Sequence, residues 1–456
     1  MSNTNSKTLN MTEGSIPKLL IVFSIPMLIG NLFQQIYNLV DSIIVGQYVG
    51  ANALGAIGAT GSVTFLFFAL FNGVGAGGGI VVAQSFGAGK DDDIRKSLTN
   101  VAYFMFAMSV FVCLLAYLMA PWLLKILKTP DEIINDAIIY MRMVCLGLPL
   151  VCVYNYFSSM LRALGDSKGP LYFLVLSCII NVFLDILFVQ TLNMNVFGAA
   201  LATVISQIIA GICCAIYALK TNEYFIFKKE DYGVSFDVIK ETARLGFPIS
   251  FQFALIAISS MGLQTVVNSF GAVAVAAFAA TSRVEQIVHQ PYQSLSQALA
   301  TFTGQNYGAK KPERIQKGFR KSTEIMLVMT VVLVICMQLF SNGIMRLFVS
   351  DVSVIEMGAM GLKITSIFYA VLGMIYVTRG VQNGIGDAAF AMQNGIVEVI
   401  ARILLPAYMV TLPLFRVWGI WWSAGLVWLI SALFCVLRYF QYKKKMYEKM
   451  DTNDID

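Results

Sequence analysis

The hydrophobic positions of this chain fall into twelve long runs that short polar segments separate. Each run reaches the length of about 20 mainly apolar residues that an α-helix needs to cross the hydrocarbon core of a bilayer. We therefore predict an all-α polytopic membrane protein with twelve transmembrane helices. The runs lie at residues 19–45, 53–82, 98–124, 137–161, 169–190, 196–219, 245–270, 273–302, 322–342, 354–378, 390–413 and 417–437.

The composition agrees with a lipid environment. Hydrophobic residues make up 57% of the chain and charged residues only 13%, whereas about 25% of the residues in a soluble domain are charged. The polar start of the chain lacks the basic region and cleavage site of a signal peptide, so we expect insertion without cleavage. All eight cysteines lie in apolar runs without CxxC spacing, which favours packing residues over disulfides or metal ligands.

Lys and Arg concentrate in alternate segments between the runs. With the N-terminus inside, the inner segments hold 24 of the 32 basic residues, Arg379 among them, and the outer loops hold 4. By the positive-inside rule, this asymmetry predicts a cell-membrane protein with both termini in the cytoplasm. The formal charge of +6 then reflects topology and contact with anionic lipids, and it indicates no nucleic-acid partner.

The chain also repeats itself at an offset of 221 residues. "VAQSFGAGKDDDIRKS" (82–97) aligns with "TGQNYGAKKPERIQKG" (303–318), and the same shift pairs Asp166 with Asp387. We therefore predict two six-helix bundles: an N-terminal lobe at 1–219 and a C-terminal lobe at 245–437. A cytoplasmic linker at 220–244 joins them, and a cytoplasmic tail follows at 438–456. Because six is even, the lobes share one orientation, an arrangement that is typical of secondary transporters.

Two aspartates interrupt these runs. A charged side chain at the centre of a bilayer costs roughly 2.5–3.5 kcal/mol, so such acids are usually functional. At 1.5 Å per residue, Asp41 lies about 34 Å along its helix and Asp185 about 24 Å, which are comparable depths. Gln34, Asn38 and Asp41 recur at i, i+4 and i+7, and Asn181 lies one turn before Asp185. A packing network of buried amides and protonated acids is the alternative to a functional site.

Seven sequence motifs follow one another along the chain: "SIPMLIGNLFQQIYNLVDSIIVG", "AQSFGAGK", "LRALGDS", "CIINVFLDILFV", "GFPISF", "TGQNYGAKKPERI" and "VQNGIGDA". Together they resemble the motifs of the multidrug and toxic compound extrusion (MATE) transporters. The pattern of acidic residues is similar to that of the bacterial and archaeal branch that is related to DNA-damage-inducible transporters. The glutamate that the norfloxacin-resistance branch carries on helix 7 has no counterpart in 245–270.

The resemblance implies a secondary antiporter, and not an enzyme, that exports organic cations and drugs against an inward flow of H⁺ or Na⁺. It implies no cofactor besides the coupling ion, and Pro26 matches the proline at which helix 1 kinks. The implied cation-coupling residues are Asp41, Tyr37, Asn38, Tyr140, Asn181, Asp185 and Thr203. If the ion is Na⁺, its implied ligands are Asp41, Asn181, Asp185 and Thr203.

We expect small, amphipathic, cationic cargo in a cavity rich in aromatic and methionine side chains, and we expect a monomer in the lipid bilayer. Glu285, Gln34 and Arg283 are assigned to that cavity, although Glu285 could instead pair with a base such as Arg283. Glu398 and Arg402 are spaced i, i+4, which favours a self-neutralising structural pair. The single histidine, His289, is interpreted as a packing residue, with a proton relay as the alternative.

Other functions remain open at this point. A lipid or lipid-linked oligosaccharide flippase could share the architecture, but such a protein needs a basic central cavity. A major-facilitator transporter would carry a D-R-x-G-R-R-like loop after its second helix, which "SFGAGKDDD" lacks. A membrane-embedded enzyme has little support, because "GIGD" (384–387) has the repeat mate "ALGD" (163–166) and therefore indicates a loop signature. No G-x-x-x-x-G-K-[ST] motif supports an ATP-driven pump.

Overall fold

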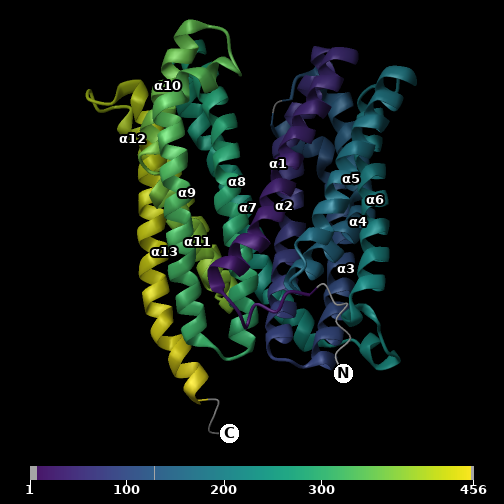
Figure 1. The fold of residues 1–456 in the computed structure, drawn as a ribbon. Helices are drawn as coiled ribbons and strands as arrows, with labels where there is room; N and C mark the ends of the chain where they lie inside the picture. Colours follow the sequence, from purple (N-terminus) through teal and green to yellow (C-terminus); the bar gives the residue numbers. More distant parts are fainter. Residues whose placement is uncertain (1–7, 128, 453–456) are drawn as a thin grey trace. The chain divides into compact units, whose positions relative to one another are not determined.

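The computed structural model describes residues 8–127 and 129–452, which form helices and no strand (Figure 1). The helices of the first half are α1 (Ile16–Tyr48), α2 (Ala51–Gly87), α3 (Asp91–Ile126), α4 (Asp131–Ala163), α5 (Lys168–Asp185), the π-helix η1 (Ile186–Thr191) and α6 (Asn195–Thr221). After the 3₁₀ turns η2 (Glu223–Phe225) and η3 (Lys229–Tyr232) come α7 (Phe236–Asn268), α8 (Ala272–Gly308), α9 (Pro312–Arg346), α10 (Val352–Ser366), α11 (Tyr369–Ile385), α12 (Ala388–Met409), η4 (Arg416–Trp418) and α13 (Gly419–Thr452).

The chain is divided into two compact units, and the boundary between them falls inside two of the helices. Unit 1 holds Ile25–Phe251 and the described residues up to Met11, whereas unit 2 holds Thr12–Ser24 and the described residues from Gln252 on. The start of α1 therefore belongs with unit 2, and the start of α7 with unit 1. Pro26 lies within one turn of the change in α1, and Pro248 lies within one turn of the change in α7.

The repeat is visible in the backbone. Three pairs of positions at the offset of 221 residues share a positive φ, which is a conformation that side chains other than glycine rarely adopt. These pairs are Gly50 (114°) with Gly271 (84°), Gly89 (70°) with Lys310 (53°), and Gly165 (92°) with Gly386 (80°). The backbone turns that join corresponding helices therefore have the same conformation in both halves.

In each half, an aspartate at the same position of the repeat connects a loop to the last helix of that half. The Asp166 carboxylate accepts hydrogen bonds from the Gly169 amide (2.9 Å) and from the Tyr217 hydroxyl on α6 (2.9 Å). Its repeat mate Asp387 pairs with Arg438 on α13, with 3.1 Å between Nε and Oδ2. Each aspartate thus caps the start of a helix and anchors it. This structural role supports the interpretation of "ALGD" and "GIGD" as loop signatures.

The predicted run 354–378 is not one straight helix. It is divided into α10 and α11, which are bent by 54° at a short break. α11 continues to Ile385 and includes Arg379, so this residue, which we counted in a cytoplasmic segment between helices, lies within a helix. Asp91–Asp93 form the first turn of α3, where acidic groups interact favourably with the helix dipole.

Lipid is the natural solvent for the outer surface of these helices. Large apolar side chains such as Leu118, Phe183 and Leu339 are mostly exposed. Among the described residues, nine helices are long and apolar enough to cross a membrane, and the bent pair α10 and α11 is a tenth candidate. α8, whose residues are all described, does not meet this criterion. In α8 the polar positions include Arg283, Glu285 and His289.

Candidate functional site

The two membrane-embedded aspartates of unit 1 meet in its interior. Asp41 lies on α1, and Asp185 is the last residue of α5, directly before the π-helical turn η1. Asp41 is 9% exposed and Asp185 is fully buried. Their side chains lie within hydrogen-bonding reach of each other. This π-helical turn ends the helix at Thr191, and it begins at the residue after the acid.

The facing carboxylates have no donor between them. Asp41 Oδ1 and both carboxylate oxygens of Asp185 are buried and have no hydrogen-bond partner among the described residues. Two ionised carboxylates in this geometry repel each other, and their buried oxygens stay unsatisfied. A proton held between them, or a small cation bound by them, removes both penalties. The site therefore fits an ion that binds and leaves.

Neighbouring polar groups surround the acid pair. The Thr203 hydroxyl on α6 lies 3.3 Å from the Tyr37 hydroxyl, and it accepts a hydrogen bond from Asn181 Nδ2 at 3.5 Å. Asn181 Oδ1 is buried without a described partner. Tyr140 lies within electrostatic reach of both carboxylates. The carboxylate, amide and hydroxyl oxygens together are the hard ligands that a Na⁺ ion would need.

A cluster of apolar side chains packs beside the site. Tyr140 and Val182 pack against a buried cluster that lines α1, α2, η1 and α6. The buried members of this cluster are Ile44, Val45, Ala53, Val189, Val196 and Ala199. In buried, apolar surroundings the charge state of an acid pair has a large effect on local stability.

Asn38 and Gln34 do not share the burial of Asp41. Helix α1 contacts α5 and α6 through Gly30, Tyr37 and Asp41, and the spacing i, i+7, i+11 places these three on one face. At 3.6 residues per turn, Gln34 is rotated about 40° and Asn38 about 80° from Gly30 around the helix axis. Both side chains are exposed, so the described contacts do not include Asn38 among the groups that hold Asp41.

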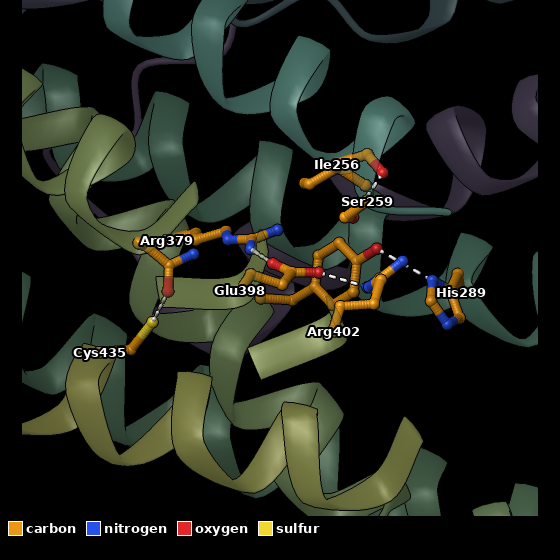
Figure 2. A network of polar contacts seen from close by, with 9 residues as sticks. Ile256, Ser259, His289, Arg379, Glu398, Arg402 and Cys435 are labelled. Carbon is orange, nitrogen blue, oxygen red and sulfur yellow. Dashed lines mark hydrogen bonds and ion pairs between the residues drawn. The ribbon is translucent and has the colours of Figure 1, made fainter. Parts of the chain in front are cut away.

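A second polar cluster lies inside unit 2 (Figure 2). Glu398 on α12 pairs with Arg402 one turn away (2.6 Å) and with Arg379 on α11 (2.7 Å). With its amide turned so that the oxygen faces these donors, Asn394 accepts hydrogen bonds from Arg379 Nε at 3.1 Å and from Gln252 Nε2 at 3.1 Å. The predicted i, i+4 pair is therefore present, but it is part of a larger network.

Arg379 is the residue that sequence reasoning missed. It was assigned to a loop because the apolar run before it ends at position 378. Its repeat mate is Ser158, which lies inside the predicted run 137–161 and is buried in α4. The repeat was therefore the signal that could have placed Arg379 inside a helix.

The remaining cavity candidates lie on α8. Arg283 is exposed, and the described ion pairs do not join it to Glu285. The Glu285 carboxylate is within hydrogen-bonding reach of Thr365, and its Oε1 is buried without a described partner. His289 Nδ1 lies 3.2 Å from the Tyr376 hydroxyl, and its ring also contacts Trp428 edge-on. His289 thus has the packing contacts that were expected of it.

Comparison with known proteins extends over nearly the whole chain. The MatE family profile matches residues 26–187 and again residues 248–408, so the same family unit occurs twice at the spacing of the internal repeat. The chain is 29% identical over 448 residues to "Probable multidrug resistance protein YpnP" of Bacillus subtilis, covering 96% of this chain and 98% of that protein. It is 23% identical to "Multidrug export protein MepA" of Staphylococcus aureus (strain NCTC 8325 / PS 47), with 96% of each covered.

Solved structures share the fold. "Crystal structure of MATE in the bent conformation" and "Outward-facing conformation of a multidrug resistance MATE family transporter of the MOP superfamily" each give a TM-score of 0.90 at 22% identity. Each comparison covers 98% of this chain and 100% of the other. The predicted all-α fold of twelve transmembrane helices in two repeated bundles is thereby confirmed.

Proposed function

The chain belongs to the MatE family of multi-pass membrane transporters, and on that premise we propose that it exports drugs and other small organic cations by antiport with H⁺ or Na⁺. The observation that carries the antiport proposal is the buried Asp41–Asp185 pair, whose facing oxygens have no donor. A group that needs a proton or cation to be satisfied, and that lies in a membrane helix, is suited to ion coupling.

The coupling ion acts through this pair. When a proton or Na⁺ enters, the repulsion between Asp41 and Asp185 is relieved, and α1 packs against α5 and α6 through Gly30, Tyr37 and Asp41. When the ion leaves, the two carboxylates repel and this contact weakens. A Na⁺ ion would be held by Asp41, Asp185, Asn181 and Thr203, which provide carboxylate, amide and hydroxyl oxygens.

The change at Asp41 is transmitted along α1. The start of this helix belongs to unit 2, and Pro26 lies just after the change of unit. A proline inside a helix removes one backbone hydrogen bond and allows a kink there. We propose that ion binding at Asp41 alters the bend at Pro26 and so changes the access of cargo to one side of the membrane.

Cargo selection involves unit 2. Glu285 offers a buried carboxylate oxygen without a described partner, which suits the positive group of a small amphipathic molecule. The Lys and Arg distribution supports a cell-membrane orientation with both termini in the cytoplasm. In this orientation Asp41 and Asp185 lie toward the outer face, where an inwardly driven ion arrives first. We propose that the protein acts as a monomer.

Everted membrane vesicles test this function directly. Dye uptake into the vesicles, which corresponds to export from the cell, should follow an imposed pH gradient or an imposed Na⁺ gradient. The gradient that drives uptake identifies the coupling ion. Uptake that requires ATP and neither gradient would contradict the proposal.

A further inference from the structure

The connection between α12 and α13, residues 411–418, carries exposed apolar side chains at one end of unit 2. Leu414 is 84% exposed, and Pro413 before it is also exposed. The connection extends sideways from its helices (Figure 1). It continues the apolar outer surface of α12, on which Leu404 and Tyr408 are each 62% exposed. An exposed apolar tip that continues a surface facing lipid is suited to contact with the bilayer.

The length of α12 places this segment at the edge of the hydrocarbon core. α12 has 22 residues and ends at Met409. At 1.5 Å per residue this is about 33 Å, and the hydrocarbon core of a bilayer is about 30 Å thick. Tyr408 therefore lies near the level of the lipid headgroups, where Tyr and Trp side chains are enriched in membrane proteins. The segment 411–418 follows directly after this level.

The backbone of the segment is prepared for a medium of low dielectric constant. The N–H groups of Leu412, Phe415 and Arg416 donate to carbonyl oxygens three or four residues earlier, at 3.0–3.3 Å, and Pro413 has no N–H group. Unpaired backbone donors are costly in lipid, so these bonds reduce the cost of insertion. The Phe415 ring contacts the Trp422 ring edge-on, with 5.9 Å between centroids. This contact fixes the segment on unit 2.

The matching segment of unit 1 is polar. At the offset of 221 residues, Leu414 corresponds to Asn193 and Arg416 to Asn195, and both asparagines are exposed. The backbone turn is shared, because φ is positive at Arg416 (45°) and at Asn195 (51°). Asn adopts this conformation more readily than most residues. Unit 2 therefore replaces two exposed amides, one of them favourable for the turn, with an apolar and a cationic side chain.

We propose that the segment 411–418 inserts into the phospholipid interface, with Leu414 among the first acyl carbons and Arg416 bound to lipid phosphate groups. In the proposed orientation this is the outer leaflet. Among the described residues, Arg416 takes part in no ion pair. A guanidinium group matches a phosphate in charge and geometry, and its long stem lets the charge stay among the headgroups. This inference goes beyond the proposed export function and does not depend on it.

Spin labels at single cysteines test the insertion in a full-length variant without the eight native cysteines. The label is placed at position 414, 193 or 404, and each protein is reconstituted at low density in vesicles of phosphatidylglycerol and phosphatidylethanolamine. Power-saturation EPR compares collisions with oxygen, which concentrates in lipid, and with a nickel chelate, which concentrates in water. The label at 414 should lie about 5–10 Å below the headgroups, whereas the label at 193 should lie in water. The label at 404 is the reference for the hydrocarbon core and for correct insertion.

Arg416→Glu should shift the label at 414 toward water, because a carboxylate is repelled by lipid phosphates. Lys125→Glu is the matched control, since Lys125 is an exposed basic residue in the last turn of α3 in unit 1, and it should leave the depth at 414 unchanged. Equal accessibility to the nickel chelate at 414 and 193 would overturn the insertion. An unchanged depth in Arg416→Glu would overturn the phosphate contact. Dipolar coupling between labels at 414 would show that a second copy of the chain covers the segment, and it would also overturn the proposal.

Discussion

Gly77 of α2 and Gly246 of α7 approach so closely that a Cβ atom on Gly77 would lie 2.6 Å from the Gly246 backbone nitrogen. Both residues belong to unit 1. Gly73, one turn earlier, is equally close to the backbone of Ser250. Between membrane helices, small residues allow such backbone contact, and the packing it permits replaces the hydrophobic effect as a source of stability. The sequence "GVGAGGG" (73–79) is therefore a helix-packing motif of α2.

Gly77→Ala should destabilise the protein, because the obstructing atoms are backbone and cannot move aside without shifting a helix. Overpacking of this kind costs about 1–3 kcal/mol. Gly79→Ala is the matched control, since the nearest atom to its Cβ is 3.8 Å away. Thermal unfolding of the two purified variants in detergent measures the difference. Equal unfolding temperatures for the two variants would contradict the role of Gly77.

The topology proposal predicts which loops face outward. Single cysteines at positions 89 and 310, in a variant without the eight native cysteines, should react with a membrane-impermeant maleimide only from the cytoplasmic side. A cysteine at position 192 should react only from outside. Leu192 and Lys310 are exposed in the structure, as is the loop at Gly89. Labelling of any of the three from the opposite side would refute the orientation.

Thr203→Ala should separate Na⁺ coupling from H⁺ coupling. The Thr203 hydroxyl contacts both Tyr37 and Asn181, and it is a ligand only if the ion is Na⁺. Loss of one such contact changes affinity roughly two- to tenfold, so the Na⁺ concentration for half-maximal transport should rise by this factor. Transport driven by a pH gradient should change by less than about twofold. Equal losses under both gradients would make Thr203 a packing residue only.

The features that were predictable from the sequence are those with local or periodic causes. Long apolar runs predict helices in lipid, and the 221-residue offset predicts that turns such as Gly165 and Gly386 share a conformation. Asp41 and Asp185 are noticeable because an acid in such a run is costly. Their approach could be inferred from comparable depth, since both helices start at the same side of the membrane.

The features that were not predictable depend on how helices pack. In the sequence, Asn38 and Asp41 both belong to one line of polar residues along a helix. In the structure, only the face of α1 that carries Gly30 and Asp41 contacts α5 and α6. The break between α10 and α11 falls at "SIFYA" (366–370), which has neither glycine nor proline and hence no local signal. Arg379 was counted in a segment between helices because charge counting assumes that a basic residue after an apolar run ends the helix, whereas it lies within α11 and pairs with Glu398 of α12.

The final prediction concerns Asp41 and Asp185 themselves. Asn has the size of Asp but cannot gain or lose a proton, and its amide can donate a hydrogen bond to the facing carboxylate. Asp41→Asn therefore satisfies the buried oxygens of Asp185 permanently, as a bound ion does only transiently. The variant should fold at least as stably as the wild type, because a repulsive contact is replaced by a hydrogen bond.

The variants Asp41→Asn and Asp185→Asn should consequently bind dye with wild-type affinity. They should no longer transport the dye against its concentration gradient, because the acid pair no longer alternates between binding and releasing the coupling ion. Proteoliposomes with an imposed ion gradient measure transport, and fluorescence anisotropy measures binding. Asp136→Asn is the control, because Asp136 on α4 is an exposed acid of the same unit and should pump normally. If Asp41→Asn pumped at the wild-type rate, the acid pair would be part of the packing, and the coupling ion would have to act elsewhere.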